Sequence, residues 1–143
     1  MIETMGLAKK IDHIAIAVKD LDAAVKTFTD NFGFPVGSSG TVPPLNMRRA
    51  FLSVGDASLE LFQPTSDQHP GAKFLADRGE GMYLLSLEVD DLAAATGALA
   101  ERGVKVSTQS IDSGIKLGFI SPKHTHGVLL QLIEHPRVKR DDG

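Results

Sequence analysis

The stretch "DHIAIAVKDLDAAV", residues 12–25, joins an alternating apolar segment to a segment with the spacing of an amphipathic helix. A second stretch, "MYLLSLEVDDLAAA", residues 82–95, repeats this pattern. An offset of 71 residues places Val18 on Val89. The chain therefore contains an internal repeat whose unit begins with a strand and a helix.

The helix in each copy has recognisable ends. Asp20 and Asp91 precede the two apolar stripes, and an aspartate at this position is a good N-cap. Gly33 and Gly103 follow the stripes, and glycine is the residue that most often ends a helix. The sequence therefore predicts one helix in each copy, bounded by an aspartate and a glycine.

Three further strands are predicted to complete each copy, because runs of β-branched and aromatic residues alternate with turn residues. A short helix at 70–77 is expected to link the copies. The resulting fold class is α+β, with two βαβββ modules forming a curved mixed sheet around a cleft. We expect a single domain, 1–143, with repeat 1 at about 10–64, a linker helix segment at 65–81 and repeat 2 at 82–136. The six strands are expected at 36–38, 47–54 and 57–63 in the first copy, and at 104–108, 115–121 and 128–134 in the second.

Composition narrows the class of protein. The 143 residues carry a net charge of −3, which does not favour a nucleic-acid partner. Cysteine is absent from the sequence, which excludes disulfides and zinc–thiolate sites. No apolar run approaches the ~20 residues of a membrane span, and the first residues lack the pattern of a signal peptide. We therefore expect a cytoplasmic protein with a small-molecule ligand and no membrane partner.

The strand alternation predicts which side chains face the cleft. Residues of a strand point alternately to its two faces, so the aliphatic face of each strand is expected to pack on a helix. Four pseudo-equivalent positions then converge on the opposite face: His13, Glu60, Leu84 and Gln131. An imidazole, a carboxylate and an amide oxygen can bind a divalent metal, whereas leucine cannot. His13, Glu60 and Gln131 are therefore candidate ligands for Zn, Ni, Co or Mg, and a site without metal is an equal alternative.

The same residues have alternative interpretations. His13 and Glu60 are the candidate catalytic pair, but His13 could also be a core histidine bonded to a backbone carbonyl. Glu60 lies between two leucines, where a lone carboxylate is costly, so a salt bridge to Arg48 or Arg49 is the competing interpretation. The candidate substrate-binding residues are Ser86, Gln131, Phe62 and Arg49.

Several motifs resemble the vicinal oxygen chelate superfamily, which includes glyoxalase I, extradiol dioxygenases and bleomycin-resistance proteins. The nearest resemblance is to the methylmalonyl-CoA epimerase family, over residues 10 to about 134. The glyoxalase-like fold, homodimerisation and a metal site at a cleft are what this resemblance implies. It rests on the segments "DHIAIAVKDLDAA", "AFLSVGDASLELFQP", "AKFLADRGEGM", "LEVDDL" and "SPKHTHGVLLQLIE".

The chain departs from the epimerase pattern at positions that carry chemistry. The epimerase family has a His-His pair where this chain has Tyr83-Leu84, and the second histidine is a metal ligand. Gln131 replaces a glutamate ligand on the final strand, and Pro44 stands where the family has an acidic residue implicated in proton transfer. The resemblance therefore implies a degenerate metal site with Leu84 in place of the expected fourth ligand.

Two functions remain open. The first is an enzyme of epimerase, isomerase or lyase type that acts alpha to a carbonyl, with an acyl-CoA as a candidate substrate and with His13 and Glu60 in the active site. The second is a non-catalytic protein that binds and sequesters a small molecule, as bleomycin-resistance proteins do. Ring-cleaving oxygenation is discounted, because it needs two histidines and one carboxylate on iron.

Overall fold

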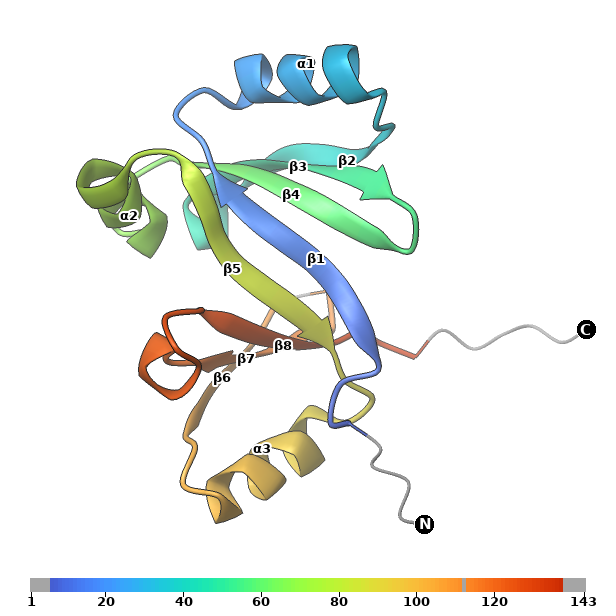
Figure 1. Ribbon diagram of the computed structural model, residues 1–143, viewed down its shortest axis with the longest axis vertical. Helices are drawn as coiled ribbons and strands as arrows, with labels where there is room; N and C mark the ends of the chain where they lie inside the picture. Colours follow the sequence, from blue (N-terminus) through green and yellow to red (C-terminus); the bar gives the residue numbers. More distant parts are fainter. Residues whose placement is uncertain (1–5, 112, 138–143) are drawn as a thin grey trace, which may run out of the picture. The chain divides into compact units, whose positions relative to one another are not determined.

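The computed structural model describes residues 6–111 and 113–137 (Figure 1). The fold class predicted from the sequence is confirmed: the same strand–helix–strand–strand–strand order occurs twice, with a helix between the two modules. The first module comprises β1 (Lys10–Ala17), α1 (Leu21–Phe32), β2 (Val36–Val42), β3 (Met47–Val54) and β4 (Ala57–Pro64), and α2 (Pro70–Arg78) follows it. The second comprises β5 (Gly81–Glu88), α3 (Leu92–Glu101), β6 (Val106–Ser110), β7 (Lys116–Ile120) and β8 (Leu130–Glu134). Two single turns of 3-10 helix, Pro43–Leu45 and Pro122–His124, precede β3 and β8.

The chain divides into two compact units, residues 12–85 and residues 1–11 with 86–143. In the 12–85 unit the strand order is β2-β3-β4-β1-β5. Strand β1 is parallel to β4, whereas β3 is antiparallel to both β2 and β4, so this sheet is mixed. In the other unit the end of β5 is followed by β8, β7 and β6, and β7 is antiparallel to both β8 and β6. That the two units form one domain stays a prediction.

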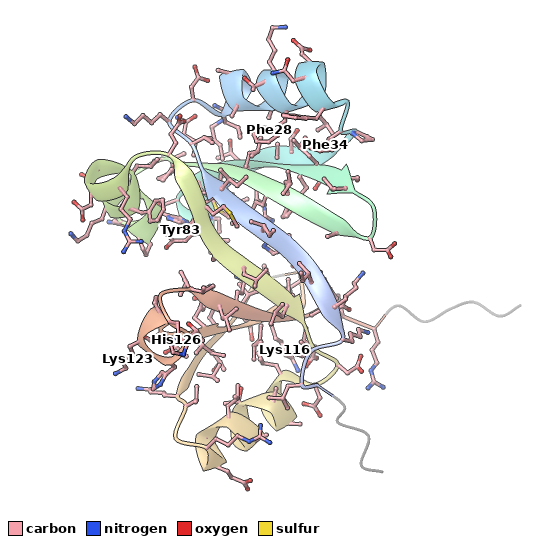
Figure 2. The ribbon with its side chains drawn as sticks, in the orientation of Figure 1. Phe28, Phe34, Tyr83, Lys116, Lys123 and His126 are labelled. Atoms are coloured by element: carbon pink, nitrogen blue, oxygen red, sulfur yellow. The ribbon has the colours of Figure 1, made fainter. Side chains whose placement is uncertain are left out.

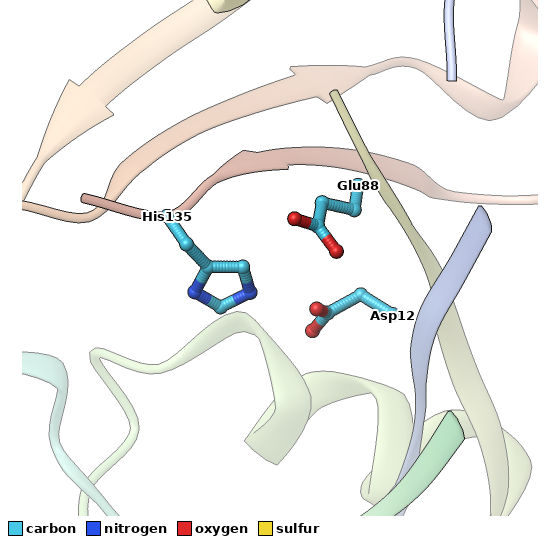
Figure 3. Close-up of side chains that lie close together, drawn as sticks. All are labelled: Asp12, Glu88 and His135. Atoms are coloured by element: carbon cyan, nitrogen blue, oxygen red, sulfur yellow. The ribbon is translucent and has the colours of Figure 1, made fainter. Parts of the chain in front are cut away.

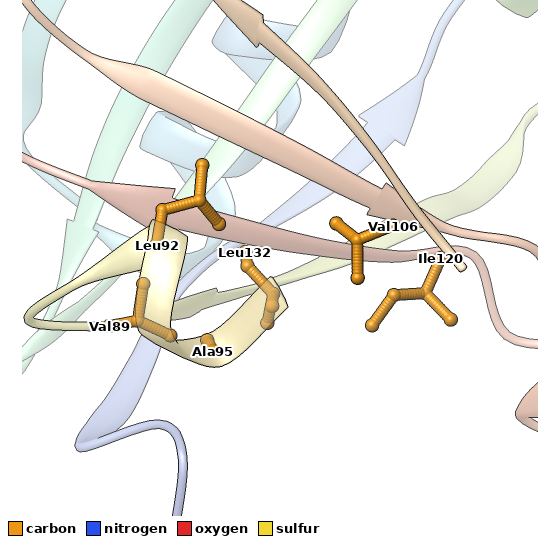
Figure 4. Packing of buried hydrophobic residues seen from close by; sticks show 6 residues of the cluster. All are labelled: Val89, Leu92, Ala95, Val106, Ile120 and Leu132. Carbon is orange, nitrogen blue, oxygen red and sulfur yellow. The ribbon is translucent and has the colours of Figure 1, made fainter. Parts of the chain in front are cut away.

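Each unit has its own apolar core between its helix and its sheet. In the 12–85 unit, Figure 2 shows Phe28 and Phe34, which pack against a cluster built on buried residues of β3 and β4 such as Leu52 and Leu61. In the other unit, the core lies between α3 and strands β6 to β8 (Figure 4). Its buried members are Val89, Leu92, Ala95, Val106, Ile120 and Leu132. The aliphatic strand faces therefore pack on the helices, as the alternation predicts.

The helix ends confirm the repeat at the level of hydrogen bonds. The carboxylate of Asp20 accepts a hydrogen bond from the Ala23 amide, 3.1 Å away, and Asp91 does the same for Ala94 at 3.0 Å. Gly33 ends α1 in the left-handed conformation, with φ of 70°, where a side chain would be strained. Both predicted N-caps and the predicted end of the first helix are thus confirmed.

The first backbone amide of each helix is bonded by the last strand of its own module. The Gln63 side-chain oxygen accepts from Leu21 N at 2.9 Å, and Glu134 accepts from Leu92 N at 2.7 Å. Gln63 and Glu134 are separated by the repeat offset of 71 residues. These bonds join each helix to the strand that carries a candidate site residue, Glu60 on β4 and Gln131 on β8.

Several predicted strand boundaries were wrong: besides the three below, β6 ends at Ser110 and not at 108, and the ends of β4 and β7 differ by one residue. Strand β2 continues past residue 38 to Val42, because pairing with β3 supplies its hydrogen bonds despite a glycine- and serine-rich sequence. Strand β6 begins at Val106 rather than at 104, because the Val104 amide bonds to the carbonyl of Leu99 and closes the end of α3. Strand β8 begins at Leu130, because the amide of Val128 bonds to the carbonyl of Thr125 in a turn. Over the described residues, no helix is long and apolar enough to cross a bilayer.

Candidate active site

The first pair of site residues comes from two parallel strands of the 12–85 unit. His13 on β1 and Glu60 on β4 alternate with residues such as Ile16 and Leu61 that pack in the core, so their side chains lie on the opposite face. Both are buried, with side chains 7% and 8% exposed. Nε2 of His13 lies 3.6 Å from Oε1 of Glu60. This close approach agrees with the prediction that His13 and Glu60 lie on the same face of the sheet.

The second nitrogen of His13 is held by its neighbour in sequence. Nδ1 lies 2.6 Å from Oδ2 of Asp12, which is a strong contact between an imidazole N–H and a carboxylate. With the proton on Nδ1, the lone pair of neutral His13 is on Nε2, the atom that faces Glu60. The alternative in which a backbone carbonyl satisfies His13 is therefore replaced by a carboxylate–histidine pair.

A cation completes this group. Nη1 of Arg49, on β3, lies 3.4 Å from Oε2 of Glu60. The guanidinium also stacks over the ring of Phe51, 5.1 Å from its centroid, and the same ring meets the His13 imidazole edge-on at 5.5 Å. The predicted salt bridge of Glu60 is thus confirmed with Arg49. Arg48 instead pairs with Asp22 of α1 at 3.2 Å. The ion pair does not exclude a catalytic role for Glu60, because Arg49 contacts Oε2 and the other oxygen, Oε1, still faces His13.

An aromatic cluster lies along the same strand. The ring of Phe62, two residues after Glu60 on β4, lies 5.1 Å from the His69 imidazole and 5.2 Å from the Tyr83 ring. Phe74 of α2 meets Tyr83 edge-on at 5.3 Å. Burial lowers the pKa of His69 and raises the pKa of the Tyr83 phenol. His69 therefore stays neutral around pH 7, and its Nδ1 accepts a hydrogen bond of 2.8 Å from the Gly71 amide at the start of α2.

The other two candidates belong to the second unit and bond to each other. The hydroxyl of Ser86 on β5 donates to Oε1 of Gln131 on β8 at 2.7 Å, and both residues are buried. This pair lies on the strand faces opposite the α3 core, as the alternation predicts. Leu84 is also buried, within the 12–85 unit. Pro44 is exposed, in the 3-10 turn before β3.

Within the 12–85 unit, His13 and Glu60 do not by themselves make up a complete site for a divalent metal. Nε2 of His13 and the Glu60 carboxylate are suitable donors, but a catalytic metal usually takes at least three protein ligands. Among the described residues of this unit, no third histidine or acidic side chain joins His13 and Glu60 in a cluster with ligand spacing. The Glu60 carboxylate is in addition neutralised by the Arg49 guanidinium. The metal assignment of His13, Glu60 and Gln131 therefore stays a prediction.

Figure 3 shows two titratable side chains of the second unit close together, Glu88 at the end of β5 and His135 just after β8. Their ligand atoms lie within 4.8 Å of each other. Lys9 and Lys10 also pair with Glu88, at 3.4 and 3.7 Å. Two cations therefore already compensate this carboxylate.

A pocket of about 260 Å³ lies between α1 and strands β2 and β3 of the 12–85 unit. Residues of α1 such as Leu21 and Val25 line it, together with β2 and with Arg48, Arg49 and Ala50 of β3. It carries none of the acid–base residues described above. We place the candidate site at His13 because side-chain chemistry, rather than volume, identifies an active site.

The sequence prediction missed Asp12, Phe51 and His69. Asp12 directly precedes His13, and a carboxylate that orients a histidine is a known arrangement, so the Asp-His pair was a readable signal. Phe51 shares a strand face with Arg49 at a spacing of two, which the alternation also predicts. The sequence carried no comparable signal for His69, since its position depends on the packing of α2.

Residues 12–120 match the sequence profile of the Glyoxalase/Bleomycin resistance protein/Dioxygenase superfamily. The ethylmalonyl-CoA/methylmalonyl-CoA epimerase of Cereibacter sphaeroides is 31% identical over 132 residues, which cover 86% of this chain and 96% of that protein. The crystal structure of methylmalonyl-CoA epimerase from Mycobacterium tuberculosis superposes with a TM-score of 0.86 at 32% identity, and covers 96% of this chain and 94% of that one. A variant of Streptomyces coelicolor methylmalonyl-CoA epimerase, in complex with 2-nitronate-propionyl-CoA, gives a TM-score of 0.82 at 30% identity, with 91% and 99% covered.

Proposed function

The chain belongs to the glyoxalase/bleomycin resistance protein/dioxygenase superfamily, and from this premise we propose that it is an enzyme that moves the proton alpha to the carbonyl of an acyl-CoA, as an epimerase does. The observation that carries this proposal is the buried His13, held between Asp12 at 2.6 Å and Glu60 at 3.6 Å. A histidine in this setting has its lone pair on Nε2 and a carboxylate on each side. It can therefore accept a proton, and the charge that it gains is stabilised on both nitrogens.

The proposed reaction begins with proton abstraction. Nε2 of His13 takes the proton from the α-carbon, and the electron pair of the broken C–H bond moves onto the thioester oxygen to give an enolate. Asp12 and Glu60 stabilise the imidazolium that forms. Return of this proton from His13 to the same face regenerates the substrate. The epimer forms when the enolate takes a proton from water on its opposite face, and His13 then releases its own proton to solvent. The sum of these steps conserves atoms and charge.

The acyl-CoA class is inferred from the relatives. The matched proteins of C. sphaeroides and M. tuberculosis are epimerases of methylmalonyl-CoA, and the S. coelicolor complex holds a CoA compound. Each is about 30% identical to this chain over most of its length. This similarity supports an acyl-CoA substrate with an acidic α-proton, of which methylmalonyl-CoA is the compound to test first.

The test is exchange of the α-proton with solvent. Chelator-treated protein is incubated with methylmalonyl-CoA in D2O, and mass spectrometry follows deuterium uptake at the α-carbon. We expect uptake faster than in a protein-free control, and loss of that acceleration in His13→Gln. The exposed His124 provides the matched control, since His124→Gln should leave the rate unchanged. Uptake at the protein-free rate in the unmodified protein would overturn the proposal.

A sequestering protein is the second candidate. The observation that favours it is the buried Leu84 at a position where the epimerase family has a metal ligand, together with the apolar cluster around Phe62. A protein of this kind would bind an apolar compound without exchanging its protons. Thermal stabilisation by uncharged apolar compounds and not by acyl-CoAs would support it. Homodimerisation and a cytoplasmic location stay predictions.

A further inference from the structure

Arg49 is the one cationic side chain that contacts the His13–Glu60 pair among the described residues of the 12–85 unit. In β3 its neighbour across to β4 is Phe62, and Phe51 is the neighbour of Glu60. Arg49 therefore reaches Glu60 diagonally across two antiparallel strands, which long side chains can do. The short distance of 3.4 Å between Nη1 and Oε2 follows from this register.

The Arg49 guanidinium is held in place by two contacts, and part of it remains available to bind a ligand. Glu60 holds one nitrogen, and the ring of Phe51 supports the guanidinium at 5.1 Å from the ring centroid. An arginine has five N–H donors in a planar fork, and here the described hydrogen bonds engage one nitrogen. The Arg49 side chain is 28% exposed, so part of it is open to a ligand. A planar fork of this kind matches a carboxylate better than any other common anion-binding side chain.

The next residue provides the contrast. Arg48 points to the other face of β3 and pairs with Asp22 of α1 at 3.2 Å. The two arginines are adjacent, have the same charge and differ in the strand face on which they lie. Only Arg49 lies beside His13 and Glu60.

We propose that Arg49 is the specificity-determining residue of this site: its guanidinium binds the free carboxylate of a malonyl-type acyl group, without a divalent cation. The proposal rests on the proposed function for its ligand class, an acyl-CoA. The Arg49 guanidinium supplies a positive charge beside His13 that does not depend on a divalent metal. An arginine anchored by Glu60 also places the carboxylate next to His13, and so brings the adjacent α-carbon towards Nε2.

The experiment compares two ligands that differ in the carboxylate alone. Binding of methylmalonyl-CoA and of propionyl-CoA is measured by isothermal titration calorimetry with chelator-treated protein. A charge-assisted hydrogen bond changes affinity by about ten- to a hundredfold. We expect methylmalonyl-CoA to bind tighter by about this factor, and the ratio of the two affinities to fall to about one in Arg49→Met.

Two further variants separate the position of the charge from its geometry. Arg48→Met removes the neighbouring charge and should keep the wild-type ratio, and Arg49→Lys keeps the charge without the fork and should give an intermediate ratio. An unchanged ratio in Arg49→Met and Arg49→Lys, no preference in the wild type, or a preference that appears only with added divalent metal would each overturn the proposal. Equilibrium binding does not depend on turnover. Loss of the preference in Arg49→Met without any α-proton exchange would thus support the role of Arg49 and reject the enzymatic function.

Discussion

Arg49 Nη1 lies 3.4 Å from Oε2 of Glu60, on the neighbouring strand of the same unit. The ion pair explains how a carboxylate that is 8% exposed is tolerated in the fold, since a buried charge needs a partner. The other oxygen of Glu60 faces His13. A single carboxylate thus connects a cation that can bind an anion to a base that can accept a proton.

Replacing Glu60 should affect both chemistry and binding. In Glu60→Gln the imidazolium of His13 loses one of its two carboxylates, and Arg49 loses its anchor. We expect α-proton exchange to fall by at least about tenfold, as is usual for a group in acid–base catalysis. The exposed Glu101 serves as the matched control, and Glu101→Gln should keep the wild-type rate. Equal rates in both variants would remove Glu60 from the site.

The buried hydrogen bond between Ser86 and Gln131 should contribute to stability. Ser86 is 0% exposed and its hydroxyl donates to the Gln131 amide oxygen at 2.7 Å. In Ser86→Ala that oxygen loses its donor, which should lower the free energy of unfolding by about 1–3 kcal/mol. Urea denaturation measures the change, with the exposed Ser107→Ala as control. A loss no larger than that of the control would contradict the prediction.

Two glycines of the second unit should respond oppositely to alanine. A Cβ on Gly118 of β7 would lie 2.7 Å from Cγ1 of Val106 and 3.0 Å from Cδ1 of Leu92, so Gly118→Ala should destabilise by about 1–3 kcal/mol. A Cβ on Gly97 of α3 would meet no atom within 4 Å, and alanine is the better helix former. Gly97→Ala should therefore stabilise by about 0.4–1 kcal/mol. Thermal unfolding measures both effects: the melting temperature should fall in Gly118→Ala and rise in Gly97→Ala. A shift of both melting temperatures in the same direction would contradict the prediction.

His69 should make stability depend on pH. Burial lowers its folded-state pKa below the 6.5 of an exposed histidine, so the unfolded chain takes up the proton first as the pH falls. The stabilisation from neutral His69 is therefore complete above about pH 6.5 and is lost as the pH falls through the folded-state pKa. Protonation also removes the Nδ1 acceptor of the Gly71 amide, a cap of the kind that is worth about 1 kcal/mol.

The comparison for this prediction is His69→Asn, which keeps a capping acceptor but does not titrate. Unfolding free energies at pH 7 and pH 5 should show a larger loss in the wild type than in His69→Asn. The exposed His126→Asn should behave as the wild type does. Identical losses in the wild type and in His69→Asn would show that the pKa of His69 is the same in the folded and unfolded states, and would contradict the prediction.

The sequence predicted the parts of the fold that depend on local patterns. The offset of 71 residues, the caps at Asp20 and Asp91, and the strand faces of His13 and Glu60 follow from periodicity and spacing. Two things depend on tertiary pairing and could not be read locally: the length of β2, which pairing with β3 extends, and the choice between Arg48 and Arg49 as partner of Glu60. Asp12 was readable beside His13 and was overlooked.

The stereochemistry of the product tests the proposed proton transfer at His13 most sharply. Chelator-treated protein is incubated with a single epimer of methylmalonyl-CoA, and the two epimers are then separated by chiral analysis. We expect both epimers in nearly equal amounts at equilibrium, and we expect His13→Gln to slow their formation while His124→Gln does not. If folded protein that binds the substrate converts the starting epimer no faster than the protein-free control does, the proposed chemistry is contradicted.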